Sequence, residues 1–220
     1  MKTNRRELLR NGILSTAALL SLPSLAKAAT GQCSNSKTPR QPEGPFYPVA
    51  DQVDTDADLI RIPGATEIAQ GQIVILEGVV IDQHCKPVQG ALVEIWQACV
   101  TGKYNHPSDP NEAAIDPNFQ YWGKAISSAT GVYRFRTIIP GAYRADVDWV
   151  RPPHIHFKIS KRGYMELITQ MYFAGDQLNA KDKILVRLPK VEQQKLIVQF
   201  KSAEGMQHPT GQFNIQIEKV

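Results

Sequence analysis

The stretch RPPHIHF, residues 151–157, carries two histidines at alternate positions behind an arginine and two prolines. In a β-strand, residues i and i+2 point to the same face, so His154 and His156 are expected to share one side. Ile155 and Phe157 then turn to the opposite side. Two neutral imidazoles on one face are a good pair of ligands for iron, zinc or copper. The alternative is a pair of hydrogen-bonded histidines on a partly exposed strand.

Tyrosines and acidic residues in the neighbouring loops are candidates for completing a metal site. Tyr104 in GKYNH and Tyr143 in PGAYR can each supply a phenolate, a hard oxygen donor that suits Fe(III). Two phenolates and two imidazoles would hold iron in the ferric state. Packed aromatic side chains remain an alternative for both tyrosines. The acidic candidates are Asp109, Asp116, Asp146 and Asp148.

The elements that must position these residues are predicted to be strands. A β-branched run at 72–82 is followed by a turn and by an alternating segment at 91–97, which together predict an antiparallel pair. The segment 126–138 predicts a hairpin with Ala-Thr-Gly at its turn. The segments 154–160 and 167–173 predict two further strands with a turn between them.

The remaining segments alternate between loops and short elements. Pro-, Gly- and Asp-rich stretches at 101–123 and 139–153 predict long loops. KILVRL is expected to extend the sheet, and VEQQKL to start a short helix. The last predicted hairpin comprises residues 195–202 and 211–218.

About eight short strands and almost no helical periodicity predict an all-β fold. We expect an antiparallel β-sandwich of about eight strands with long active-site loops. The chain has 220 residues and is 42% hydrophobic, which suffices for a core. The expected parts are an export signal at 1–28, an N-terminal arm at 29–70 and the sandwich at 71–220.

The first 28 residues have the pattern of an export signal. Arg5 and Arg6 precede the apolar run ILSTAALLSL, and Ala26-Lys27-Ala28 resembles a cleavage site. NRRELL resembles a twin-arginine signal, with a general secretory signal as the alternative. A run of this length is too short to span a bilayer. We therefore expect an exported, periplasmic protein without a stable membrane anchor.

The charge of the chain gives no support for a nucleic-acid partner. The net charge is +4, and residues 1–28 account for all of it. The rest of the chain carries 20 basic and 20 acidic residues, with no basic patch.

Three cysteines occur in the chain, and export permits disulfides. The predicted strand at 91–97 holds Cys85 and Cys99 roughly 20 Å apart, which is beyond disulfide reach. If a bridge forms, Cys33 is one of its partners.

Several motifs in order resemble the intradiol ring-cleavage dioxygenases, and most closely their protocatechuate-cleaving branch. The resemblance covers roughly residues 40–176. Its motifs are EGPFYP, VVIDQHCKPVQGALVEIWQA, GKYNHPSD, LITQMYFAGD and the continuous stretch from Asp116 to Phe157.

The resemblance implies a non-haem Fe(III) centre. Its implied ligands are the tyrosinates Tyr104 and Tyr143 and the histidines His154 and His156. Arg151 matches the active-site arginine of the family, and Gln170 in TQMYF matches a glutamine behind the ligands. Trp96 in EIWQA matches a tryptophan near the site, although core packing also accounts for it.

The implied reaction is cleavage of a protocatechuate-like catechol by O2 between its two hydroxyl carbons, giving a cis,cis-muconate. Iron serves as Lewis acid and template. Tyr143 leaves the metal when the substrate binds, and the Arg151 cation stabilises negative charge on the ring.

Two features bear on the substrate and on partner chains. In β chains of the family the motif around the matching tyrosine reads PGPYPW. Here Arg144-Ala145-Asp146 follows Tyr143, so the loop at the entrance to the substrate site is expected to differ. No long helical segment precedes the predicted sandwich, which favours the protocatechuate-like branch. That branch implies an α-chain partner that shares the active-site cleft, or a homo-oligomer.

Two other functions fit parts of the sequence. VVIDQHCKPVQGALVEIW also resembles transthyretin-like sandwiches, which would make the protein an exported binding module without a catalytic metal. That interpretation leaves Tyr104, Tyr143, His154 and His156 together unexplained. A zinc or copper protein using the same histidines is the third hypothesis.

Overall fold

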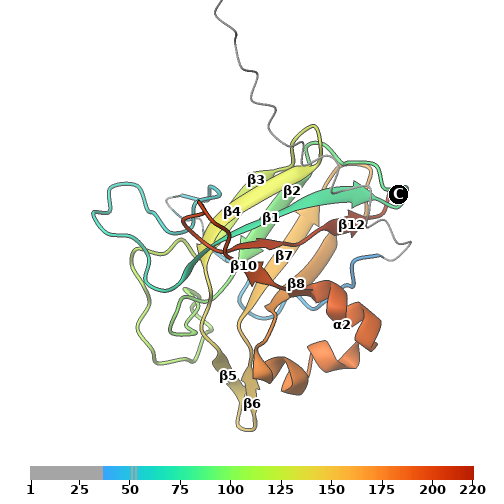
Figure 1. The fold of residues 1–220 in the computed structure, drawn as a ribbon. Helices are drawn as coiled ribbons and strands as arrows, with labels where there is room; N and C mark the ends of the chain where they lie inside the picture. The colour runs from blue at the N-terminus through green and yellow to red at the C-terminus, as the bar shows by residue number, and fades with distance from the viewer. Residues whose placement is uncertain (1–36, 51, 53) are drawn as a thin grey trace, which may run out of the picture.

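The computed structural model describes residues 37–50, 52 and 54–220, and most regular structure in this part of the chain is β (Figure 1). Two five-stranded sheets pack against each other, and a two-stranded hairpin stands apart from them. The predicted β-sandwich is therefore confirmed. The predicted export signal lies outside the described residues.

The first sheet is built around the long strand β1 (Ile73–Asp82). Strand β4 (Val132–Ile138) pairs antiparallel with β1 on one side. On its other side β1 pairs in parallel with two short strands, one along each half. The short strands of this sheet are β10 (Phe200–Lys201), β11 (Thr210–Gln212) and β12 (Ile215–Ile217).

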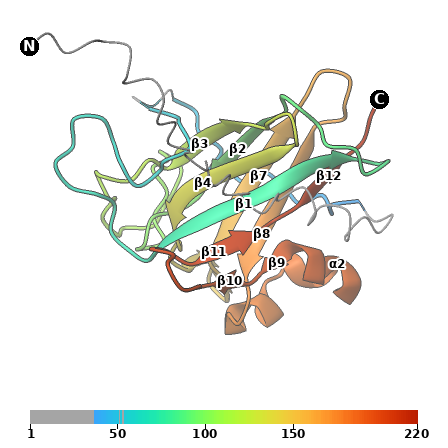
Figure 2. The ribbon, with the colours of Figure 1, turned by 45° about the horizontal axis from the view of Figure 1, so that its top comes forward.

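The second sheet carries the predicted histidine strand at its centre. Its strand order is β3-β2-β7-β8-β9, and only the last pair is parallel. The two sheets face each other in Figure 2. The bounds are β2 (Leu92–Trp96), β3 (Trp122–Ile126), β7 (His154–Ser160), β8 (Leu167–Phe173) and β9 (Ile197–Val198).

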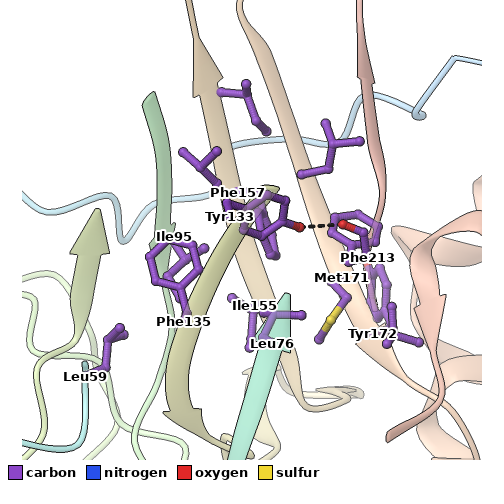
Figure 3. Close-up of a cluster of buried hydrophobic side chains, with 14 of the residues drawn as sticks. Leu59, Leu76, Ile95, Tyr133, Phe135, Ile155, Phe157, Met171, Tyr172 and Phe213 are labelled. Carbon is purple, nitrogen blue, oxygen red and sulfur yellow. Dashed lines mark hydrogen bonds between the residues drawn. The ribbon is translucent and has the colours of Figure 1, made fainter. Parts of the chain in front are cut away.

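The core lies between the two sheets, because each contributes one apolar face. Ile95, Ile155 and Phe157 of the second sheet meet Leu76 and Phe135 of the first, and all five are fully buried (Figure 3). Burying each such side chain contributes roughly 1.5–3 kcal/mol.

A buried tyrosine adds a polar link inside this core. Tyr133 Oη donates a hydrogen bond to the carbonyl of Phe213 at 2.5 Å, which satisfies both groups (Figure 3).

The pairing of neighbouring strands differs from the prediction. The segments at 72–82 and 91–97 form β1 and β2, but these belong to opposite sheets, and so do β3 and β4. The connections therefore cross from one sheet to the other. Alternating hydrophobicity shows which side chains are buried, but both sheets bury the same kind of face, so it does not choose the partner strand.

Three other local predictions need revision. KILVRL is not a strand, because it contains the 3₁₀ helix η2 (Leu185–Arg187). The predicted loop at 139–153 contains the hairpin of β5 (Tyr143–Asp146) and β6 (Trp149–Arg151), which projects at the lower end of Figure 1. The predicted final hairpin is replaced by a β10–β11 pair and by separate pairing of β12 with β1.

The short helical elements lie together beside β8. The predicted helix is α2 (Lys190–Leu196), and η1 (Gln177–Lys181) precedes η2. None of the helices in the described ranges is long and apolar enough to cross a membrane.

The cysteines agree with the expectation that Cys85 and Cys99 do not pair with each other. Cys85 is disulfide-bonded, whereas Cys99 is a buried free cysteine. The expected partner, Cys33, lies outside the described residues.

Candidate metal centre

The two histidines lie on the face of β7 that points away from the sandwich core. Both are 2% exposed, while Ile155 and Phe157 pack inside the core. The expectation that the two pairs occupy opposite faces is therefore confirmed. The surface that the histidines occupy is covered by loops and by the N-terminal arm.

The strand register places further predicted residues beside the histidines. Trp96 on β2 lies opposite His156, which in turn lies opposite Gln170 on β8. Tyr172 lies opposite His154. Directly opposed residues share a face, so this row of side chains follows from β pairing alone. Trp96 is 1% exposed and stacks on the His156 ring at 4.8 Å between centroids, with 12° between planes.

The two tyrosines reach the same place from different segments. Tyr104 lies in the loop between β2 and β3, where Asp109 Oδ2 accepts a hydrogen bond from its backbone N–H at 2.6 Å. Lys103 Nζ donates to the Asp109 carbonyl at 2.8 Å and tightens this turn. Tyr143 begins β5 and lies opposite Arg151 on β6.

Glycines let the two tyrosine segments approach each other. Gly102 has φ +79°, and a Cβ there would lie 2.4 Å from the carbonyl oxygen of Ala142. A Cβ on Gly141 would lie 2.4 Å from the carbonyl oxygen of Val100. Glycine adopts positive φ readily and adds no side chain, so both motifs can pack backbone to backbone.

The four predicted ligands converge in one cluster. Tyr104 Oη lies 3.4 Å from His154 Nε2. The Tyr104 and Tyr143 rings are perpendicular with centroids 5.6 Å apart, and Tyr143 is 5.7 Å from the His154 ring. The two histidine rings are 4.9 Å apart. The structure thus brings together side chains from three segments of the chain.

The orientation of the histidines fits a role as ligands. His154 Nδ1 lies 2.7 Å from the Pro152 carbonyl, so Nδ1 carries the proton and the Nε2 lone pair faces Tyr104. A hydrogen bond of this kind is what fixes the tautomer of a metal-binding histidine. Nδ1 of His156 is buried without a hydrogen-bond partner among the described residues. Two nitrogen and two oxygen donors suit a transition-metal ion.

The acidic candidates have other roles. Asp109 accepts hydrogen bonds from two backbone N–H groups of its own loop, and Asp116 accepts from the backbone N–H groups of Asn118 and of the distant Gln70. Asp146 accepts from the next backbone N–H, and Asp148 forms an exposed ion pair with Lys183. Within residues 37–50, 52 and 54–220, no group of three or more His, Cys, Asp or Glu residues could hold a metal. Any ion held at this cluster would depend on the tyrosines.

Burial sets the protonation of the four side chains. Desolvation raises the pKa of Tyr104 and of Tyr143 above 10, and the Arg151 cation opposes part of that rise. Desolvation and then the Arg151 charge lower the pKa of both His154 and His156 well below 6.5. The histidines are therefore neutral, and a bound cation would favour the phenolate forms of the tyrosines.

Arg151 is a buried cation at the edge of this cluster, 3% exposed. Its Nη2 donates to Gln170 Oε1 at 2.8 Å and to Tyr172 Oη at 3.2 Å. Its Nη1 lies 3.0 Å from His154 Nε2. The charge is balanced by Asp182, whose side chain is fully buried 3.1 Å from Arg151 Nε.

Asp182 and Tyr172 were missed by the sequence analysis. Asp182 lies 31 residues after Arg151, and no local pattern in the segment that contains it marks it as a partner for an arginine. Tyr172 belongs to the TQMYF segment, and its position two residues after Gln170 in a strand places both on one face.

The N-terminal arm closes over the site. Phe46 packs on Tyr104 with 4.7 Å between ring centroids. The arm is fastened to β8, since Thr169 Oγ1 donates to the Pro39 carbonyl and Gln170 Nε2 to the Pro42 carbonyl, both at 2.7 Å. The described segment 37–50 of the predicted arm thus contributes to the site.

Comparisons with known proteins show the family and the fold of this chain. A family model described as "Dioxygenase" matches residues 42–219. Among solved structures, the dioxygenase domain of a dioxygenase–carbohydrate-binding fusion from Streptomyces sp. SirexAA-E has a TM-score of 0.62 at 27% identity, covering 84% of this chain and 100% of that one. An intradiol ring-cleavage dioxygenase from Tetranychus urticae shares the fold, with a TM-score of 0.63 at 21% identity over 83% of this chain and 95% of that one.

The chain belongs to the intradiol ring-cleavage dioxygenase family. Among curated proteins it is similar to the protocatechuate 3,4-dioxygenase beta chain of Burkholderia cepacia. The two are 39% identical over 165 residues, which is 73% of this chain and 70% of that relative.

Proposed function

We propose that this protein is a non-haem Fe(III) dioxygenase that cleaves a catechol between its two hydroxyl carbons. The observation that carries the proposal is the buried convergence of Tyr104, Tyr143, His154 and His156, with Tyr104 Oη 3.4 Å from His154 Nε2. Two oxygens and two neutral nitrogens form a donor set that favours Fe(III) over a softer ion.

The contacts of the clustered side chains suggest a separate role for each of them. Tyr104, Tyr143, His154 and His156 would hold the iron. When bound, Fe(III) supplies Lewis acidity and a template on which both catechol oxygens are oriented. The Tyr143 phenolate is the least buried of the four, 9% exposed, and is placed to accept a proton from an entering catechol hydroxyl.

Arg151 supplies the positive charge of the site. Its Nη1 lies 3.0 Å from His154 Nε2, and this contact supports the expectation that its N–H groups would face an oxygen of a catechol bound at these ligands. A fixed cation in a dry site stabilises negative charge that develops on the ring during the reaction.

The aromatic side chains around the proposed metal site suit a planar substrate. Phe46, Tyr47, Trp96 and Trp122 cluster around the two tyrosines. Such surfaces favour a planar ring over an extended aliphatic ligand. Because the similar beta chain is named for protocatechuate, a protocatechuate-like catechol is the first substrate to test, with an α-chain partner or a homo-oligomer completing the cleft.

Export to the periplasm is part of the same proposal and has its own test. A fusion of residues 1–28 to a reporter that is active only in the periplasm should report export. Replacing Arg5 and Arg6 by lysine should abolish export if the route is the twin-arginine pathway. Unchanged export in that variant would favour the general secretory route.

The decisive experiment combines metal analysis with product identification. Natively purified protein should contain about one iron per chain and be red-brown, because tyrosinate–Fe(III) charge transfer absorbs visible light. Incubation with protocatechuate, catechol and hydroxyquinol under O2 should give a cis,cis-muconate from at least one of them. A colourless, iron-free protein would favour the transthyretin-like binding module, and colourless zinc-loaded protein the zinc alternative. Ring opening outside the two hydroxyl carbons would contradict the proposal.

A further inference from the structure

The carboxylate of Asp182 is held on both oxygens although it lies outside the cluster of ligands. Its Oδ1 accepts from Arg151 Nε at 3.1 Å and from Trp149 Nε1 at 3.2 Å. Its Oδ2 accepts from Arg151 Nη2 at 3.2 Å and from the backbone N–H of Leu185 at 3.1 Å. The side chain is fully buried, so water does not compete for these bonds.

This carboxylate determines which edge of the Arg151 guanidinium is free. The Nε and Nη2 edge faces Asp182, and Nη2 is shared with Gln170 and Tyr172. Only Nη1 points toward the ligand cluster, 3.0 Å from His154 Nε2. A guanidinium is planar, so fixing one edge at two points fixes the direction of the opposite end.

We propose that Asp182 is the positioning residue of the site: it holds Arg151 with Nη1 directed at the bound catechol. In the protein without metal, Nη1 donates to the His154 Nε2 lone pair. If His154 Nε2 held a metal ion, Nη1 would lose this acceptor, and its N–H groups would be available to a substrate oxygen. This inference rests on the proposed function and identifies what orients its cation.

The test compares Asp182→Asn with Asp148→Asn. Asn keeps the shape of the side chain but removes the charge. Asp148 is an exposed acid on the β5–β6 hairpin, which also carries Arg151, and it pairs with Lys183. Asp182→Asn should keep its iron content and visible band, with KM for the catechol within about threefold and kcat lowered roughly 10- to 100-fold, as expected when a positioned group is misplaced. Asp148→Asn should match the unmodified protein. A folded, iron-loaded Asp182→Asn with unchanged kcat would overturn the inference.

A second measurement does not depend on iron or turnover. Side-chain ¹⁵N NMR of the metal-free protein should show the Arg151 Nε–H as a sharp, slowly exchanging signal, assigned by its loss in Arg151→Lys. The signal should broaden or disappear in Asp182→Asn and persist in Asp148→Asn. An equally sharp signal in Asp182→Asn would refute the positioning role. If the unmodified protein proves to lack iron and ring cleavage, the proposed function fails while this readout still decides what orients Arg151.

Asp182→Asn leaves the buried Arg151 cation without its ion-pair partner, so a second variant is needed in case this one does not fold. Asp182→Glu then serves as the second variant, since it keeps the charge and moves the carboxylate by one methylene. It should retain iron and lower kcat about tenfold through a displaced guanidinium. Full activity in Asp182→Glu together with a displaced Arg151 in its crystal structure would contradict the inference.

Discussion

Tyr104 Oη and His154 Nε2 lie 3.4 Å apart although 50 residues separate them along the chain. The loop that carries Tyr104 and the strand that carries His154 meet only because β2 and β7 are neighbours in the second sheet. The pairing of these strands is therefore the structural basis of the proposed metal site.

Replacing Tyr104 by Phe should remove a ligand without changing the packing volume. We expect the visible band to lose most of its intensity and iron content to fall by at least half, because one anionic donor is gone. Absorption spectra and metal analysis of natively purified protein measure both. Tyr164→Phe, which alters a tyrosine that packs against the sandwich core and not against the ligand cluster, is the control and should leave the colour unchanged. An unaltered spectrum in Tyr104→Phe would exclude it as a ligand.

Replacing Gly102 by Ala should separate the two tyrosine segments. The new Cβ would lie 2.4 Å from the Ala142 carbonyl oxygen, so the loop with Tyr104 must move. Gly163→Ala is the matched control, because Gly163 has a similar φ of +84° and nothing within 4 Å of a Cβ. Both variants carry the left-handed strain of about 1–2 kcal/mol, whereas only Gly102→Ala should also lose iron. Urea unfolding and iron analysis separate the two effects; equal iron in both would argue against this role of Gly102.

Replacing Arg151 by Gln should destabilise the protein strongly, because it leaves Asp182 as a buried, unpaired carboxylate. Breaking a buried ion pair from one side costs about 3–5 kcal/mol. Arg134→Gln breaks the Arg134–Glu77 pair, whose arginine side chain is 63% exposed, and should cost less than about 1 kcal/mol. The free energy of unfolding in urea measures both. Similar losses of unfolding free energy in the two variants would show that the buried ion pair stabilises the protein no more than the exposed pair does.

The stability of the core should fall at alkaline pH through Tyr133. Burial raises the pKa of Tyr133 well above 10 in the folded protein, while the unfolded chain releases that proton near pH 10. Its contribution is therefore complete below pH 10 and is lost as the pH rises further. The stability advantage over Tyr133→Phe should shrink by about 1.4 kcal/mol per pH unit above 10. Urea unfolding at several pH values tests this, and a pH-independent difference would contradict it.

Much of the site could be read from local patterns. The alternation in HIHFKIS places His154 and His156 on one face because side chains alternate along any strand. The Gly-Lys-Tyr and Pro-Gly-Ala-Tyr motifs were selected by resemblance to a family, since the residue types of Tyr104 and Tyr143 fit packing equally well. Their glycines have a physical explanation only in the structure, where the two backbones meet.

The arrangement of strands could not be read in the same way. The segments at 72–82 and 91–97 were correctly identified as strands, yet they lie in opposite sheets. KILVRL has an apolar, β-like composition but forms a 3₁₀ turn next to Asp182, where the Leu185 N–H is bonded to the buried carboxylate. Tertiary contacts override local propensity at such positions.

Local patterns along the chain suffice to predict the class of fold and the face on which each strand residue lies, because hydrophobic alternation and turn residues act over a few neighbours. The folded arrangement was needed to learn which strands pair, that Tyr143 lies opposite Arg151, and that Asp182 balances that cation from 31 residues away. These relationships join distant segments, and they depend on packing and desolvation that no local pattern records.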